Sequence, residues 1–107
     1  MIIMHGLFDL KEGRTEGDFR RAFDLFSEHL KDLDMVVSWR FMRHQEHEGY
    51  NAREPSTQYY VSVEFADMHR AEQSWAYIEK NDEPMKSLHD AVLSKIQDTV
   101  FFLSADA

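Results

Sequence analysis

The feature that most constrains the fold is a pair of alternating sequence runs between Met35 and Phe65, joined by a polar loop over residues 45–56. Alternation of apolar and polar residues with a period of two is typical of a β-strand with one buried face. The loop contains glycine, asparagine and proline, which favour turns. We therefore predict a long β-hairpin whose turn is centred near Ala52.

The two faces of this hairpin differ in chemistry. The apolar face is predicted to lie on the core and carries Val37, Trp39, Phe41, Val61, Val63 and Phe65. The opposite face carries Ser38, Arg40, Met42, His44, Tyr60, Ser62 and Glu64. Strand residues are seldom so ionic, because charged side chains are depleted in sheets. This second face is the best candidate for a functional site.

A turn at Ala52 also predicts the register of the hairpin. Residues whose numbers sum to about 104 then face each other across the antiparallel pair. The expected pairs are Arg40 with Glu64, Met42 with Ser62, and His44 with Tyr60. A register shifted by two residues is the alternative.

The chain before the hairpin predicts one strand and one helix. Residues 2–10 alternate, with a wholly apolar even-numbered face. Thr15 can then cap a helix that begins near Glu16, with Asp18 in a variant of the capping box. Apolar residues recur along this helix at helical spacing, as Phe19, Ala22, Phe23, Phe26, Leu30 and Leu33. The helix is therefore predicted to pack on a sheet.

The chain after the hairpin predicts two helices and a last strand. Asp67 is a plausible cap for a helix that runs to about Lys80. A third helix is expected after Pro84, which is tolerated in a first turn, and its apolar positions are Met85, Leu88, Val92, Leu93 and Ile96. Residues 99–104, TVFFLS, are short and rich in β-forming side chains. They are predicted to form the final strand.

Composition restricts the class of protein. The 107 residues are 43% hydrophobic and 30% charged, which predicts one globular domain over residues 1–107. The formal net charge is −8, which disfavours nucleic acid and anionic membranes as partners. The absence of cysteine excludes disulfides and a thiol nucleophile. The first residues have no basic segment of a signal peptide, so a cytoplasmic location is expected by default.

The predicted order β-α-β-β-α-α-β is that of a ferredoxin-like α+β fold. Right-handed crossovers place both helical segments on one face of a four-stranded antiparallel sheet, in which the first and third strands are central neighbours. The other face stays uncovered and exposes a large, partly apolar patch, which calls for a partner.

Here the chain resembles the dimeric α+β barrel superfamily. The resemblance lies in the order of elements, the size and the passage VEFADMHRAEQSW, where a strand ends in Glu-Phe and an Asp-capped helix follows. It implies a homodimer in which two open sheets pack face to face and enclose a cavity. We therefore expect the open sheet face to bind a second copy of the chain.

The main functional hypothesis is that this cavity binds a small anionic or aromatic molecule. Its predicted ligand-binding residues are Arg40, Met42, His44, Ser62 and Ser38. Its predicted catalytic residues are His5, Glu64 and Tyr60. An imidazole oriented by a carboxylate can move a proton near neutral pH, and Arg40 can grip an anion. The alternative is a purely structural role. Arg40 and Glu64 would then form an ion pair at a dimer interface, and His5 would be a partly buried residue whose hydrogen bonds are made within the protein.

Other functions are carried as alternatives. One is a cofactor-independent monooxygenase or isomerase with His5 as general base, and another is a structural or regulatory dimer without a ligand. Whether the protein is an enzyme is open. The haem-degrading members of the superfamily use a tryptophan, a histidine and an asparagine around the haem, and the resemblance implies that Trp75 and His89 could take the first two roles. The first strand, however, has His5 where those members have the asparagine. Trp75 is accordingly predicted to be a core residue.

Metal and phosphate chemistry are disfavoured. His44 and His47 lie on a strand end, where this spacing does not present two rings to one ion as a helical pair would. The local basic cluster of Arg40, Arg43, His44, His47 and Arg53 is expected to be mostly solvated charge. Ser38 and Ser62 have no triad, and the chain has no glycine-rich phosphate loop. No cofactor and no metal are expected.

Overall fold

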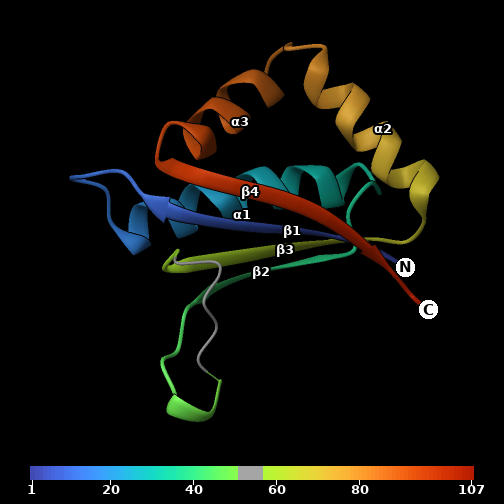
Figure 1. Cartoon of the computed structure of the whole chain (residues 1–107). Helices are drawn as coiled ribbons and strands as arrows, with labels where there is room; N and C mark the ends of the chain where they lie inside the picture. The colour runs from blue at the N-terminus through green and yellow to red at the C-terminus, as the bar shows by residue number, and fades with distance from the viewer. Residues whose placement is uncertain (51–56) are drawn as a thin grey trace.

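The computed structural model of the chain describes residues 1–50 and 57–107. The strands and helices follow one another as β1 (Ile2–Leu10), α1 (Glu16–Asp32), β2 (Ser38–Arg43), the short 3₁₀ helix η1 (Glu48–Tyr50), β3 (Tyr59–Phe65), α2 (Met68–Glu79), α3 (Met85–Leu93) and β4 (Ile96–Ala105) (Figure 1). The predicted turn near Ala52, and Arg53 of the basic cluster, lie outside the described residues.

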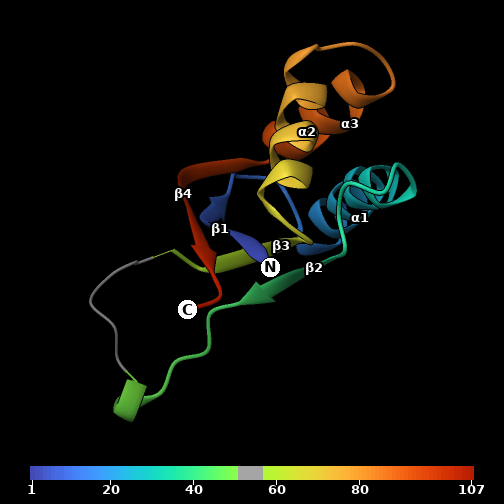
Figure 2. The ribbon, with the colours of Figure 1, turned by 90° about the vertical axis from the view of Figure 1, so that its right-hand side faces the viewer.

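The four strands form one antiparallel sheet in the order β2-β3-β1-β4. All three α-helices lie on one side of this sheet, and its other face is open (Figure 2). The predicted ferredoxin-like α+β fold is confirmed, with β1 and β3 as central neighbours.

Both predicted helix caps are present. The Thr15 hydroxyl accepts from the Asp18 backbone N–H at 3.1 Å, and the Asp67 carboxylate accepts from that of Arg70 at 2.8 Å. Each bond satisfies one of the backbone donors that a helix start leaves without a partner. The caps explain why α1 and α2 begin where the sequence predicts.

The core lies between the sheet and the helices. Phe8 on β1 is 1% exposed, and its ring packs against Phe19 of α1 with centroids 4.8 Å apart. Phe41 and Tyr59 complete an aromatic group around Phe8, with centroids at 6.1 and 5.8 Å. Burial of this aromatic area is the main force that holds α1 on the sheet.

The expected hairpin register is wrong, and the alternative, shifted by two residues, is the one observed. Arg40 faces Ser62, Met42 faces Tyr60, and Glu64 faces Ser38 instead of Arg40. His44 lies beyond the end of β2. The register depends on where the loop turns, and the strand alternation is the same in both registers, so the sequence pattern did not distinguish them.

Three smaller predictions about the elements are also wrong. Val36 is the residue buried before β2, at 4% exposure, while Val37 is 42% exposed, because regular alternation begins only at Ser38. The last strand begins at Ile96 rather than Thr99. Ile96 therefore belongs to β4 instead of the third helix, and Leu93 at the end of α3 is exposed.

Candidate functional site

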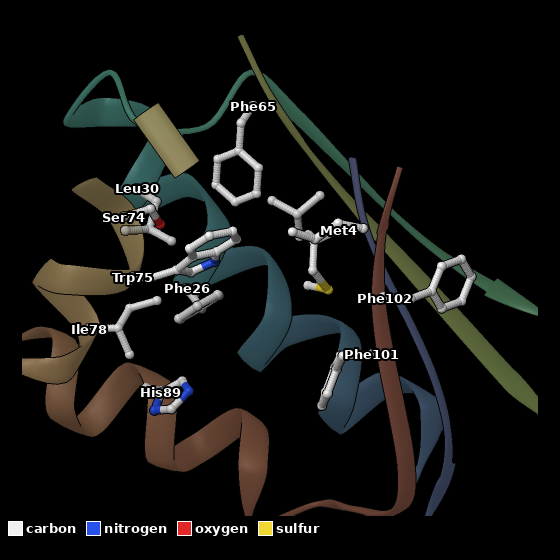
Figure 3. Close-up of a pocket in the computed structure, with 12 residues that line it drawn as sticks. Met4, Phe26, Leu30, Phe65, Ser74, Trp75, Ile78, His89, Phe101 and Phe102 are labelled. Carbon is white, nitrogen blue, oxygen red and sulfur yellow. The ribbon is translucent and has the colours of Figure 1, made fainter. Parts of the chain in front are cut away.

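A cavity lies on the helix side of the sheet, between the three helices and strands β1, β3 and β4 (Figure 3). Its volume is about 390 Å³, within the range of small-molecule sites. The lining residues are Met4, Phe26, Leu30, Val63, Phe65, Ser74, Trp75, Ile78, His89, Phe101, Phe102 and Leu103. Ten of these twelve are apolar or aromatic, so the cavity favours an apolar ligand.

Aromatic rings build much of the cavity wall. Trp75 of α2 meets Phe65 of β3 edge-on, with centroids 5.9 Å apart and planes at 72°. Trp75 thus packs against the core as predicted, and another part of it lines the cavity. The ring centroids of Phe26 on α1 and His89 on α3 are 5.8 Å apart. Such walls suit the flat faces of an aromatic molecule.

Among the residues that the structure describes, two polar side chains line the cavity. Ser74 of α2 is 1% exposed, and its hydroxyl has no hydrogen-bond partner among the described residues. A buried hydroxyl without a partner costs free energy. Because other side chains cover the Ser74 oxygen, a ligand atom can bond to it only after the serine side chain turns toward the cavity. Within residues 1–50 and 57–107, His89 of α3 is the only titratable group that lines it.

Burial lowers the pKa of His89 below that of an ordinary imidazole, because the charged form loses water on the apolar wall. The neighbouring Asp90 carboxylate opposes this shift and is the weaker influence. At neutral pH the cavity therefore contains an uncharged imidazole.

This shift predicts a pH dependence of stability. The unfolded chain binds the His89 proton more tightly than the folded chain, so the free energy of unfolding should fall as the pH drops below about 6.5. His89→Gln should reduce this fall, and His69→Gln, which changes an exposed histidine, should not. Urea unfolding from about pH 8 to about pH 5 measures the differences. Identical pH profiles for wild type and His89→Gln would contradict the prediction.

None of the eight predicted site residues lines this cavity. Those within the strands lie instead along the open sheet face, where β1 pairs with β3 and β3 with β2. The Ser38 hydroxyl donates to Glu64 at 2.9 Å. Arg40 and Met42 are exposed, Ser62 is buried, and His44 is exposed outside β2. Seven of the predicted site residues therefore share the open face of the sheet, and His44 does not.

His5 is the centre of a hydrogen-bonded group on the open face. Its Nδ1 lies 2.6 Å from the Tyr60 hydroxyl, and its Nε2 lies 2.7 Å from Ser104 Oγ. Its ring also stacks on Phe102, with centroids 4.6 Å apart. Both ring nitrogens thus have partners in the chain. A general base at His5 would have to give up one of these bonds, and its catalytic role stays a prediction.

The basic cluster does not form one site. Arg43 bonds to Glu16 at 3.1 Å on the helix side, while Arg40 lies on the open face. His44 and His47 are exposed. Within residues 1–50 and 57–107, no three histidine, aspartate or glutamate side chains converge in a way that would hold a metal ion.

Several cavity residues were outside the predicted site. Ser74 interrupts the apolar stripe that contains Ala71 and Ile78, and a polar residue at a stripe position is a signal that could have been used. The sequence points to Trp75 and His89 only through the resemblance to haem-degrading proteins. Phe101 and Phe102 of β4 lie on opposite faces of the sheet, and the sequence does not indicate which of the two faces the helices.

A protein family described as a family of unknown function, DUF6614, matches residues 1–105. The chain belongs to this family. No curated protein is significantly similar to it in sequence. Family membership thus adds no activity to what the geometry shows.

Solved structures confirm the fold. An Arabidopsis thaliana protein aligns with a TM-score of 0.77 and 6% identity over 100% of this chain and 96% of that chain. SnoaB, a cofactor-independent oxygenase from Streptomyces nogalater, aligns with a TM-score of 0.70 and 10% identity over 99% of this chain and 92% of that chain. A Mesorhizobium loti protein, described as a dabb family protein with a ferredoxin-like fold, aligns with a TM-score of 0.62 and 16% identity. The alignment covers 99% of this chain and 97% of that chain. These similarities confirm the predicted ferredoxin-like α+β fold.

None of the helices in the described part of the chain is both long enough and apolar enough to cross a membrane.

Proposed function

We propose that this protein binds a small, uncharged aromatic molecule in the cavity between its helices and β4. The observation that carries this proposal is the lining of the cavity, which is apolar and aromatic at ten of its twelve residues, with the unpartnered Ser74 hydroxyl buried in its wall. A ligand with aromatic rings and one hydroxyl or carbonyl group would satisfy that hydroxyl and cover the rings around it.

The charge of the cavity narrows the predicted ligand class from anionic or aromatic molecules to aromatic ones. No lysine or arginine is among the lining residues, and His89 is neutral at pH 7 because its pKa is lowered. An anion would lose its hydration there without gaining a counter-charge. An anionic ligand held by Arg40 on the open face stays a separate prediction.

Titration calorimetry with phenol, naphthol and naphthoate tests this proposal. Naphthol should bind, and naphthoate should bind much more weakly. Ser74→Ala should weaken naphthol binding by about threefold to tenfold, the equivalent of one hydrogen bond. Ser104→Ala is the matched control, because this serine lies on the open face against His5.

Two results would contradict the cavity as the site. One is the absence of heat with any of the aromatic probes. The other is preferential binding of naphthoate that Arg40→Gln abolishes and Ser74→Ala leaves unchanged. The second result would instead support the predicted site on the open face.

A second candidate function is cofactor-independent oxygenation of the bound molecule. It is favoured by the position of His89, a neutral imidazole in an apolar cavity, in a chain whose fold SnoaB shares. His89 would take the proton of an acidic phenol, and the resulting imidazolium would stay beside the phenolate as its counter-charge while this electron-rich anion reacts with oxygen. An oxygen electrode with the same probes tests it, and turnover unchanged in His89→Gln would exclude this base.

We also propose that two copies of the chain pack through their open sheet faces. Dimeric proteins of this fold include one from a Jannaschia species, which aligns with a TM-score of 0.69. In this chain the open face combines apolar side chains with Arg40 and Glu64, which the observed register leaves apart. A two-fold axis repeats both charges on the facing sheet, where they can pair between copies.

A further inference from the structure

We infer that Gly6 and Phe101 together determine the width of the cavity, and so the size of the aromatic ligand that it accepts. This inference rests on the proposed function. It assigns specificity to two residues on neighbouring strands, β1 and β4, that face each other in the sheet.

The first observation is a contact that only glycine allows. A Cβ atom placed on Gly6 would lie 2.8 Å from the Phe101 ring carbon Cε1 and 2.8 Å from Cγ2 of Val61. Carbon atoms in good contact are about 3.5–4.0 Å apart. The Phe101 ring therefore rests on the backbone of β1 because residue 6 has no side chain.

The second observation is the side of the sheet on which this contact lies. Figure 3 shows the Phe101 ring on the cavity side of β4, while the Phe102 ring points to the other side. Phe101 also lines the cavity and is 51% exposed. It is thus a wall residue at the open part of the cavity, with room to move.

A side chain at residue 6 would shift this wall. Val61 is buried in the core and cannot move far, whereas the half-exposed Phe101 ring can. The ring lies on the helix side of the sheet, so a displacement away from the backbone of β1 moves it toward the cavity. Any residue larger than glycine at position 6 should consequently narrow the cavity.

The inference is tested by calorimetry with phenol, naphthol and anthrol, which differ in ring number. Gly6→Ala should weaken naphthol binding by about tenfold, the effect of a misplaced methyl-sized group in an apolar pocket, and should affect phenol less. Phe101→Ala should widen the cavity and allow anthrol to bind as well as naphthol. In the Phe101→Ala background, Gly6→Ala should then have almost no effect on naphthol.

Gly17→Ala is the matched control, because a Cβ on Gly17 meets its nearest atoms only at 3.9 Å. It should leave all three affinities unchanged. Thermal melts of each variant verify folding. If Gly6→Ala does not fold, Phe101→Ala gives an independent answer, because the Phe101 side chain is half-exposed and its removal should be tolerated.

The outcomes separate this inference from the proposed function. If the wild type binds none of the probes, the proposed function fails and the inference fails with it. If the wild type binds naphthol but Gly6→Ala and Phe101→Ala keep its size preference, only the inference is overturned. An equal loss from Gly6→Ala with and without Phe101 also overturns it, because Gly6 would then act through Val61 or through folding.

Discussion

Replacing Phe8 with alanine is expected to lower the free energy of unfolding by about 3–5 kcal/mol, the usual cost of removing a buried phenylalanine. Phe8 is 1% exposed and touches aromatic rings from α1, β2 and β3. Its loss would leave a cavity that these rings cannot fill without moving together. For a domain of this size the change is a large part of the total stability.

Urea unfolding of Phe8→Ala, followed by far-ultraviolet circular dichroism, measures this loss. Leu25→Ala is the matched control on α1, because Leu25 is 57% exposed and should change stability by less than about 0.5 kcal/mol. A loss of under about 1 kcal/mol in Phe8→Ala would show that the aromatic group does not act as the centre of the core.

The second large effect is expected from Phe102→Glu, which should convert the proposed homodimer into a monomer. Phe102 is 48% exposed on the open face and stacks on His5. A two-fold interface would repeat the new carboxylate in both copies, each time without a partner. We expect the dissociation constant of the dimer to rise by more than about a hundredfold.

Light scattering at micromolar protein measures this change. The wild type should have about twice the chain mass of 12.7 kDa, and Phe102→Glu about the chain mass itself. Leu25→Glu adds the same charge to an exposed position on α1, on the helix side, and should remain dimeric. A monomeric wild type would refute the dimer, and a dimeric Phe102→Glu would place the interface elsewhere.

Exposure along β4 supports the same region as an interface. On the open face of this strand, Val100 and Phe102 are 53 and 48% exposed although both are apolar. They lie on an edge strand, whose outer backbone groups pair with no other described strand. Long apolar edges invite association, so natural proteins usually cover them.

Residue patterns within single elements were reliable guides to this protein. The stripe from Phe19 to Leu30 predicts α1, and the side chains of Thr15 and Asp67 mark where two helices begin. The alternation of β1 and β3 predicts which of their residues enter the core. These features depend on neighbours within a few residues in the chain, where backbone geometry alone sets the spacing.

The candidate site was less predictable for the opposite reason. The sequence indicated polar residues on the open face, where Tyr60 bonds to His5 and Ser38 bonds to Glu64, whereas His44 lies beyond the end of β2. The cavity on the other side of the sheet depends on how far α2 and α3 stand from β4, which no local pattern encodes. Trp75 illustrates the limit, since an apolar stripe position can face either a filled core or a space.

What the sequence by itself determined was the order of the elements, the ferredoxin-like topology and the apolar face of each element. Only the tertiary structure decided the hairpin register, the contact of Phe101 with Gly6 and the location of the cavity. The physical reason is that periodicity shows which face of an element is buried. The distance and offset between two elements depend on side chains far apart in the chain, and those distances determine where an unfilled volume remains.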